Sequence, residues 1–169
     1  MIPTLILNNK TLERVNEFLY LGIFLDEDVT CNAHINFIAN KISKNIGILK
    51  RLKYTLPKNI LKTLYSSLIH PHLNYGTLLW GYNMDRLIIL QKKAIRIITH
   101  SYYLAHTSGL FKLLRIIKVE DIFNLKQLIF YHKFINKKLP NPINSILVSE
   151  DRTLRSCHSA KFLKSVIYT

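Results

Sequence analysis

Three small sets of side chains in this sequence could bind a metal ion or carry out a reaction, and the first is a run of acids. Asp26, Glu27 and Asp28 are consecutive and Thr30 follows them. Carboxylates are the usual ligands of Ca²⁺ and Mg²⁺, but neighbouring side chains point in different directions and no second group of ligands stands nearby. Acids and a threonine just before a helix cap its positive end. We therefore expect these residues to cap the helix that follows.

The other two sets are a pair of histidines and a pair of cysteines. His70 and His72 are two positions apart, but no cysteine or carboxylate accompanies them, whereas a zinc site needs three or four ligands. Cys31 and Cys157 are separated by 126 positions, which is typical neither of a disulfide framework nor of a metal-binding cluster. The sequence therefore predicts structural roles for both pairs, with no metal ligand and no cofactor.

The motifs of common enzyme classes are missing from the sequence. It contains no Walker loop, no Gly-x-Gly-x-x-Gly, no nucleophile elbow and no His-Glu-x-x-His, and it has only five glycines. Two-metal phosphoryl transfer needs separated carboxylates that converge on one site, and nearly all acids here stand at predicted helix starts or in loops. We therefore predict that the chain has no catalytic residue of its own.

The basic residues are concentrated in the middle of the sequence. The chain has 24 Lys and Arg against 10 Asp and Glu, a net charge of +14, and fourteen of the basic residues lie between residues 29 and 119 together with a single acid. Such a positive field attracts a polyanion, so nucleic acid is the leading candidate partner. The alternatives are a solvated basic surface that only aids solubility and, more weakly, a membrane surface.

Composition predicts one folded domain inside the cell. The 169 residues suit a single core, and the 49% hydrophobic and 11% aromatic content excludes a disordered chain. The apolar start at residues 1–7 is too short for a signal peptide, and no apolar run approaches the ~18 residues of a spanning helix. We expect an intracellular protein, cytoplasmic and/or nuclear, that does not enter a membrane.

Local patterns predict a small β segment followed by helices. Residues 5–15 are typical of a hairpin with a turn at Asn8–Asn9, and the run Phe18–Leu25, apolar on both faces, predicts a third strand buried between layers. Helices are predicted over 32–56, 57–69, 73–81, 85–99, 110–114 and 120–138. The first of these helices has an apolar stripe that contains Ile35, Ile38, Ile42, Ile46, Leu49 and Leu56.

A series of short motifs, in order along the chain, resembles one known family. The segments Leu12–Phe18 and Tyr20–Ile23, followed by Asp26 and His34–Ile35, resemble the end of the palm in non-LTR (LINE-type, Jockey-like) retrotransposon reverse transcriptases. Further segments resemble the thumb region of that family: Lys41–Ser43, Ile46–Leu49, Leu56–Pro57, Leu64–Ile69, Pro71–Gly76, Leu79–Gly81, Leu90–Arg96, His106–Thr107 and Leu110–Phe111. The resemblance covers residues 4–138.

The resemblance, together with these patterns, implies a mostly α fold. A small N-terminal antiparallel β-hairpin or sheet edge (residues 1–28) would precede a helical thumb-like bundle (29–105) and a helical C-terminal extension with an irregular tail (106–169). Tyr20, Leu21 and Gly22 resemble the primer grip, the hairpin that seats the 3′ end of the primer. The helices after it would hold the template–primer duplex, RNA–DNA or another duplex, by its backbone. The expected phosphate-binding residues are Lys41, Lys44, Lys50, Arg51, Lys53, Lys92, Lys93 and Arg96.

The sequence also departs from the family pattern. The family's catalytic aspartates would lie before Met1, and the chain contains no Ala-Asp-Asp. We therefore expect a fragment of an RNA-directed DNA polymerase that lacks the catalytic palm; the parent polymerase would need Mg²⁺, and its palm and fingers would be the missing partner. The alternative is a structural or protein-interaction remnant that packs on the missing palm, as the apolar strand and the apolar helix from Glu120 suggest.

Overall fold

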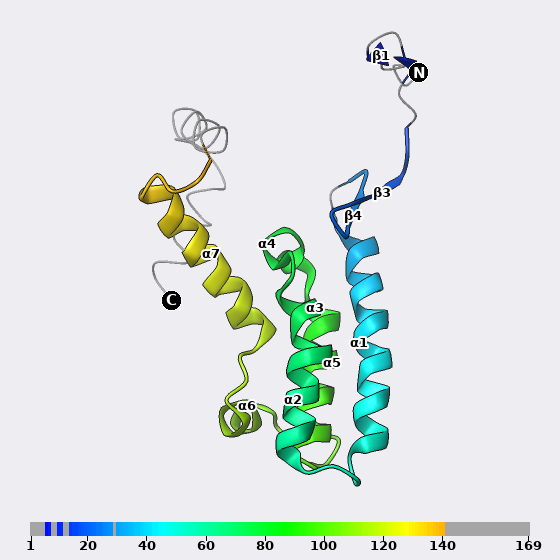
Figure 1. Ribbon diagram of the computed structural model, residues 1–169, viewed down its shortest axis with the longest axis vertical. Coiled ribbons are helices and arrows are strands. Elements are labelled where there is room, and N and C mark those ends of the chain that lie inside the picture. Colours follow the sequence, from blue (N-terminus) through cyan, green and yellow to red (C-terminus); the bar gives the residue numbers. More distant parts are fainter. Residues whose placement is uncertain (1–5, 8–9, 12–13, 29, 141–169) are drawn as a thin grey trace.

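The computed structural model describes residues 6–7, 10–11, 14–28 and 30–140. The Asn8–Asn9 turn, Cys157 and the irregular tail predicted after residue 140 lie outside the described residues. Within them the protein is mostly helical, with two short antiparallel strand pairs at its N-terminal end (Figure 1). The predicted fold class is therefore confirmed. No described helix combines the length and the apolar composition that a membrane crossing requires.

The N-terminal strands form two hairpins. β1 (Ile6–Leu7) pairs with β2 (Lys10–Thr11), and β3 (Glu17–Tyr20) pairs with β4 (Ile23–Asp26). The prediction of one strand over residues 18–25 was wrong, because Leu21 and Gly22 both adopt positive φ angles, 47° and 79°, and form a tight turn. All four residues of β3 are exposed, so this strand is not buried between layers.

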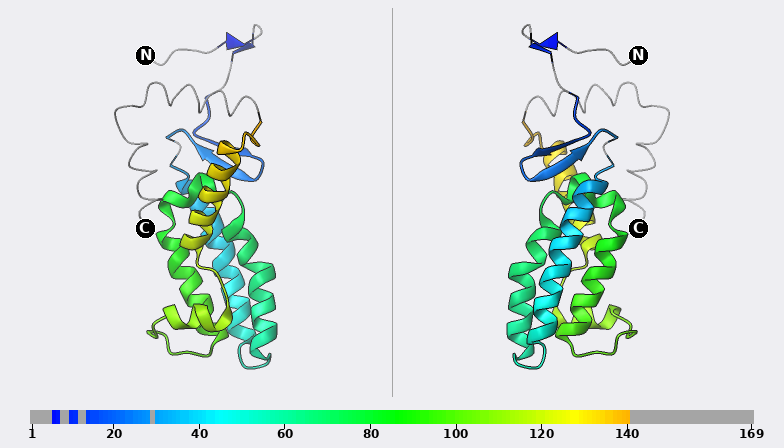
Figure 2. Two further views of the ribbon diagram at one scale, coloured as in Figure 1. Left: turned by 90° about the vertical axis from the view of Figure 1, so that its left-hand side faces the viewer. Right: turned by 90° about the vertical axis from the view of Figure 1, so that its right-hand side faces the viewer.

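The helices form a bundle below the second hairpin. They are α1 (Asn32–Leu52), α2 (Lys58–Leu68), α3 (His70–Asn74), α4 (Thr77–Trp80), η1 (Gly81–Asn83) and α5 (Asp85–Ile98), followed by α6 (Ser108–Leu114) and α7 (Val119–Ile135). α1 and α5 run in the same direction, and α2 runs antiparallel to both (Figure 1). The β3–β4 hairpin and α6 lie at opposite ends of the bundle (Figure 2).

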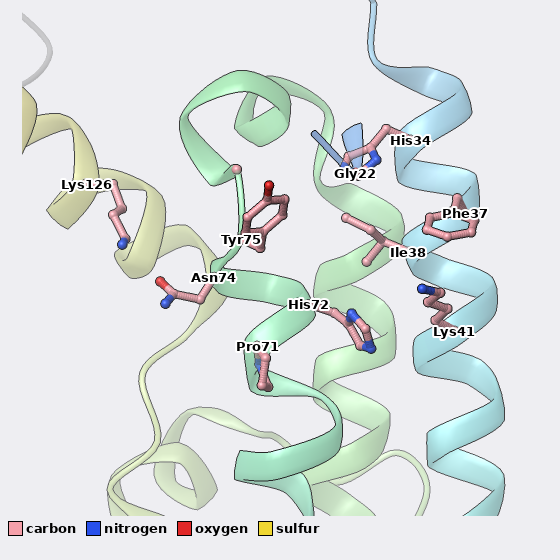
Figure 3. Close-up of a pocket in the computed structure, with 11 residues that line it drawn as sticks. Gly22, His34, Phe37, Ile38, Lys41, Pro71, His72, Asn74, Tyr75 and Lys126 are labelled. Atoms are coloured by element: carbon pink, nitrogen blue, oxygen red, sulfur yellow. The ribbon is translucent and has the colours of Figure 1, made fainter. Parts of the chain in front are cut away.

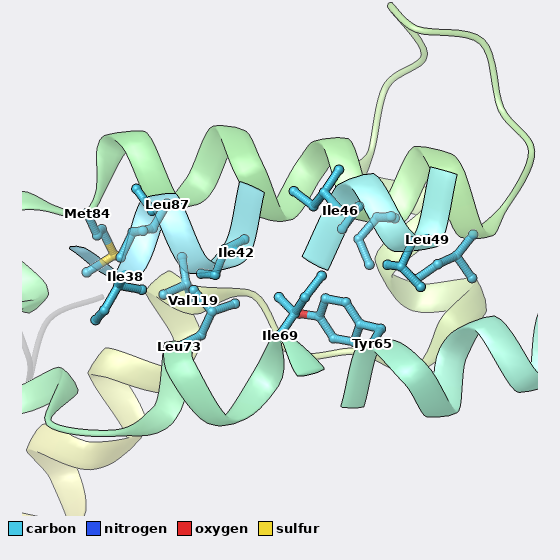
Figure 4. Close-up of a cluster of buried hydrophobic side chains, with 14 of the residues drawn as sticks. Ile38, Ile42, Ile46, Leu49, Tyr65, Ile69, Leu73, Met84, Leu87 and Val119 are labelled. Carbon is cyan, nitrogen blue, oxygen red and sulfur yellow. The ribbon is translucent and has the colours of Figure 1, made fainter. Parts of the chain in front are cut away.

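The core is built on the apolar stripe of α1. Ile35, Ile38, Ile42, Ile46 and Leu49 are buried, as the sequence predicted, while Leu56 is partly buried beyond the end of the helix. They pack against apolar residues of α2, α3 and α5 (Figure 4). The buried partners include Leu61, Tyr65, Ile69, Leu73, Leu87, Ala94, Ile95 and Ile98.

One buried polar side chain links the core to the start of α7. The Gln91 amide nitrogen donates to the Tyr65 hydroxyl (2.8 Å) and to the Ile117 carbonyl (3.0 Å), and the Gln91 amide oxygen accepts from the Val119 N–H (2.9 Å). Burial raises the pKa of Tyr65 to about 12, so its hydroxyl stays protonated. These bonds fix the point from which α7 leaves the bundle.

Two predicted helices differ from the structure. The helix expected over residues 73–81 is divided into α3 and α4 at Gly76, whose φ is +64°, and Tyr75 and Leu79 are more than half exposed. The last predicted helix, from Glu120, carries apolar residues on all sides, a pattern that predicts neighbours around it. In the described part of the chain, however, only Val119 and Ile122 of α7 are buried, and its other apolar side chains are partly or largely exposed.

Candidate nucleic-acid interface

A basic pocket lies where α1 and α5 end. Because the two helices run in the same direction, their C-terminal turns come together at the end of the bundle farthest from the β3–β4 hairpin (Figure 1). Basic side chains are favourable there, since they oppose the negative ends of the two helix dipoles. The pocket has a volume of about 500 Å³ and is lined by Lys50, Lys53, Tyr54, Lys93, Arg96, Ile97, Ser101, Tyr102 and Tyr103.

Hydrogen bonds hold the loop after α5 against this pocket. The Arg96 Nε donates to the Ala105 carbonyl (2.9 Å), and the Ser101 N–H donates to the Arg96 carbonyl (3.0 Å). The hydroxyls of Thr99 and Ser101 are 2.8 Å apart and share a further hydrogen bond. The loop is thus folded back onto the last turn of α5. Its position brings two consecutive tyrosines, 102 and 103, to the pocket.

Three tyrosines of the pocket are exposed to solvent. Tyr54, Tyr102 and Tyr103 are 85%, 76% and 73% exposed. The Lys53 ammonium lies 5.2 Å from the centre of the Tyr54 ring, and the His100 ring meets it edge-on at 6.0 Å. Aromatic rings beside cations are the combination by which proteins bind bases and phosphates together. Sequence reasoning missed these tyrosines, although the Tyr102–Tyr103 pair in a polar bend was a usable signal.

The predicted phosphate-binding residues lie in different parts of the structure. Lys50, Lys53, Lys93 and Arg96 line the basic pocket, whereas Lys41 lines a different pocket, and Lys44, Arg51 and Lys92 line neither. Helix geometry explains the separation on α1. Residues 41 and 50 are nine positions apart, which places their side chains on nearly opposite sides of the helix. Among described residues the one ion pair joins Arg14 and Glu27, so no acid neutralises the four cations of the basic pocket.

A second pocket, here called the hairpin pocket, lies beside the β3–β4 turn. Its volume is about 630 Å³. The Tyr75 hydroxyl donates to the Leu21 carbonyl (2.5 Å), which anchors the turn to the end of α3, while the Tyr20 and Leu21 side chains are exposed. Figure 3 shows the lining residues: Gly22, His34, Phe37, Ile38, Lys41, Pro71, His72, Asn74, Tyr75, Gly76 and Lys126.

Both histidines that line the hairpin pocket, His34 and His72, have lowered pKa values. Burial lowers the pKa of His34, and burial followed by the Lys41 charge lowers that of His72. The His34 Nδ1 accepts from the Phe24 N–H (3.4 Å), and its buried Nε2 has no hydrogen-bond partner among the described residues. A neutral His34 ring with the proton on Nε2 fits this arrangement. His70 is partly buried at the start of α3 and does not line the pocket.

The acidic run does cap α1, through its first member. Asp26 accepts from the N–H groups of Thr30 (2.6 Å), Cys31 (3.2 Å) and Asn32 (3.2 Å) and from the Thr30 hydroxyl (2.6 Å). The hydroxyl bond and the backbone bonds lower the pKa of Asp26 against an opposing effect of desolvation. The capping prediction is therefore confirmed for Asp26 and Thr30. Glu27 instead forms the ion pair with Arg14.

No described group of side chains is arranged as a metal site. Within residues 6–7, 10–11, 14–28 and 30–140, no three His, Cys, Asp or Glu side chains are placed so that they could hold a metal ion. Cys31 is buried and its thiol donates to the Leu79 carbonyl (3.7 Å). Burial raises the pKa of Cys31, and the nearby Asp26 adds to the effect, so the thiol stays protonated at neutral pH.

Comparison with known proteins gives a consistent set of relatives. The probable RNA-directed DNA polymerase from transposon X-element of Drosophila melanogaster is 27% identical over 131 residues, which are 72% of this chain and 14% of the relative. Over this range the chain is similar to a transposon RNA-directed DNA polymerase. The RNA-directed DNA polymerase from mobile element jockey of the same fly is also 27% identical, over 129 residues, 70% of this chain and 14% of its own length.

A third relative agrees with these two. The probable RNA-directed DNA polymerase from transposon BS of Drosophila melanogaster is 27% identical over 117 residues, 65% of this chain. The resemblance to non-LTR retrotransposon reverse transcriptases that the motifs predicted is therefore confirmed. The chain spans only about one seventh of the length of these relatives. No protein-family model and no solved structure matches the chain.

Proposed function

We propose that this chain is the thumb-like part of an RNA-directed DNA polymerase and holds the template–primer duplex by its phosphates. The observation that carries the proposal is the basic pocket, where four cations at the ends of two parallel helices meet and none of them pairs with an acid of the described residues. The relationship to transposon polymerases favours a template–primer duplex, such as an RNA–DNA hybrid, as the polyanion. Phosphate contacts of this kind do not depend on base sequence.

The four cations are suited to backbone binding. Lys50, Lys53 and Lys93 are point charges on flexible stems, which tolerate the varied geometry of a duplex. Arg96 is held more firmly, because its Nε already donates to the Ala105 carbonyl, and its two terminal nitrogens remain to donate to one phosphate. Each phosphate that they neutralise releases condensed counterions, which favours binding at low salt.

The β3–β4 turn supports a second contact at the other end of the bundle. Leu21 is 72% exposed at the tip, and the bond from Tyr75 to its carbonyl holds the turn in place. We propose that Tyr20, Leu21 and Gly22 seat the primer terminus. α1, with 21 residues and a length of about 31 Å, runs from the end of the bundle that carries this turn to the end that carries the basic pocket. The primer end and the more distant duplex would then contact opposite ends of the bundle.

In this proposal the chain binds and orients the duplex, and the reaction belongs to the rest of the polymerase. The catalytic carboxylates and the Mg²⁺ that they hold would come from the palm, and we assign Mg²⁺ to no residue of this chain. Any activity of the chain would then require the palm and fingers as partners. The relatives are about seven times longer than the matched region, which leaves ample sequence for those parts.

A binding experiment with a matched control tests the proposal. The full chain and a variant with Lys50, Lys53, Lys93 and Arg96 changed to Gln are titrated with a labelled RNA–DNA hybrid, and anisotropy is followed at low salt. We expect affinity to fall on the order of tenfold or more. The control removes as many charges from exposed sites elsewhere: Lys58, Lys112, Lys133 and Lys138. Equal losses in both variants would contradict a specific role for the pocket.

A specific observation also favours the alternative function, a surface that packs on another part of a polymerase. Phe18, Leu19 and Tyr20 of β3 are each more than half exposed, and α7 exposes Leu125, Leu128 and Ile135. Such apolar surface is typical of protein contacts. Under this alternative the isolated chain would self-associate in analytical ultracentrifugation, and a supplied palm would replace the self-association by a complex of the two. A stable monomer that binds a hybrid would contradict it.

A further inference from the structure

We propose that the basic pocket stacks an unpaired base, so that the chain prefers a duplex with a single-stranded extension over a blunt one. This inference rests on the proposed function, because it assumes that nucleic acid enters the pocket. It adds a class of ligand to that function: an unpaired nucleotide, recognised by its flat base as well as by its phosphate.

The first support is the exposure of three aromatic rings in one place. Tyr54, Tyr102 and Tyr103 all line the pocket and are all more than 70% exposed. They come from two segments distant in the sequence, the end of α1 and the loop after α5. Neither segment needs a tyrosine for the core, since these rings are not buried against it. A group of open aromatic surfaces marks a place where a flat apolar partner is bound.

The second support is the charge that surrounds the rings. Lys53 lies over the Tyr54 ring, and Lys93 and Arg96 line the same pocket, with no ion pair to a described acid. An apolar protein partner would leave these cations without counter-charges. A single-stranded nucleotide offers both a π-face and a phosphate, and base stacking on an aromatic side chain tolerates any base. The combination therefore fits an unpaired nucleotide better than a protein surface.

The third support is that the loop that carries two of the tyrosines is held by hydrogen bonds before any ligand arrives. The Arg96 bond to the Ala105 carbonyl and the Ser101 bonds to Arg96 and Thr99 fix the loop that carries Tyr102 and Tyr103. Tyr54 is packed edge-on against His100. A site that is already ordered loses little conformational entropy on binding. The pocket volume of about 500 Å³ also lies within the range that small-molecule sites occupy.

Three hybrids that share one duplex separate stacking from phosphate binding. The first is blunt, the second carries a four-nucleotide single-stranded extension, and the third carries the same extension built from abasic nucleotides, which keep the phosphates and lack the bases. We expect the natural extension to tighten binding by roughly fivefold or more for each stacked base. The abasic extension should recover only the small part of that gain that comes from its charges.

Protein variants complete the test. Changing Tyr54, Tyr102 and Tyr103 together to Ala should abolish the difference in affinity between the extended and the blunt hybrid, whatever it does to the affinity for the blunt hybrid itself. Changing them to Phe should keep the gain, because the rings remain. Tyr82→Ala is the exposure-matched control, since Tyr82 is 75% exposed and lies outside the pocket. All these side chains are exposed, so the variants should fold.

The outcomes distinguish this inference from the function on which it rests. If the blunt hybrid binds with a salt-dependent affinity but the natural and abasic extensions give the same gain, stacking is refuted and phosphate binding stands. If the Ala variant loses blunt and extended hybrids equally, the tyrosines do not stack an unpaired base and the inference also fails. If the blunt hybrid does not bind at all, the proposed function itself is refuted.

Discussion

Replacing Gln91 with Ala should destabilise the protein strongly, because one side chain satisfies three groups. Gln91 is 1% exposed, and its amide bonds the Tyr65 hydroxyl, the Ile117 carbonyl and the Val119 N–H. Each buried polar group left without a partner costs about 1–3 kcal/mol. Counting the three groups and some relaxation, we expect a loss of about 3–6 kcal/mol, a large part of the ~5–15 kcal/mol of a typical domain.

Urea denaturation measures this loss directly. Trp80 is the single tryptophan and is buried, so its fluorescence reports unfolding of the core. Gln91→Met is the matched variant: it keeps most of the volume and removes the hydrogen bonds, which separates the polar contribution from that of a cavity. Hydrogen exchange at the Val119 amide should accelerate in both variants. A loss below about 1 kcal/mol for Gln91→Ala would refute the reasoning, because it would mean that these groups find other partners.

Two further predictions concern the hairpin pocket and its surroundings. Gly76→Ala should destabilise the protein by about 1–2 kcal/mol, since φ is +64° there and a Cβ would lie 2.7 Å from the Ile23 Cδ1. The control is Gly47→Ala, in open space on α1, which should instead stabilise the protein in the same urea assay. Equal effects of the two substitutions would contradict the claim that Ala is strained at residue 76. Burial lowers the pKa of His34 from 6.5, so the unfolded chain binds the proton more readily and stability, intact above pH 6.5, should fall as the pH drops below it. His34→Gln should make that pH profile less steep in urea titrations, and the slope that remains should come from His72, whose pKa burial also lowers; a His34→Gln profile as steep as the parent's would contradict this assignment.

Sequence periodicity predicted the core because α1 repeats its apolar residues on one face. The stripe from Ile35 to Leu49 is buried as expected. The cap at Asp26 was also predictable, because an acid before a helix accepts hydrogen bonds from the free N–H groups and opposes the positive end of the helix dipole. The hydrophobic pattern hid the β3–β4 turn within a continuous apolar run, in which no polar residue marks the bend, whereas the resemblance of Tyr20, Leu21 and Gly22 to a primer-grip hairpin did point to a turn there. Gly22 was visible in that run, but an apolar segment with one glycine fits a buried strand as well as a hairpin.

The sequence predicted that the candidate site is built from basic residues, but not which of these residues share one pocket. The pattern of α1 and α5 shows which faces are basic, but nothing local to either helix shows that the two run in the same direction. That arrangement brings Lys50 and Lys93 to one pocket. The separation of Lys41 from Lys50 did follow from helix geometry, and treating all eight cations as one set overlooked it. Tyr102 and Tyr103 were missed because the position of their loop depends on tertiary hydrogen bonds.

The salt dependence of hybrid binding tests most directly whether the basic pocket grips nucleic acid by its phosphates. Affinity of the full chain for a blunt RNA–DNA hybrid is measured between low and physiological salt, alongside the variant with Gln at residues 50, 53, 93 and 96. The logarithm of the association constant should fall linearly with the logarithm of the salt concentration in both proteins. Four phosphate contacts predict that the slope is steeper by about 3 to 4 in the parent chain than in the variant. Equal slopes in the two proteins, or a parent slope near zero, would contradict the account.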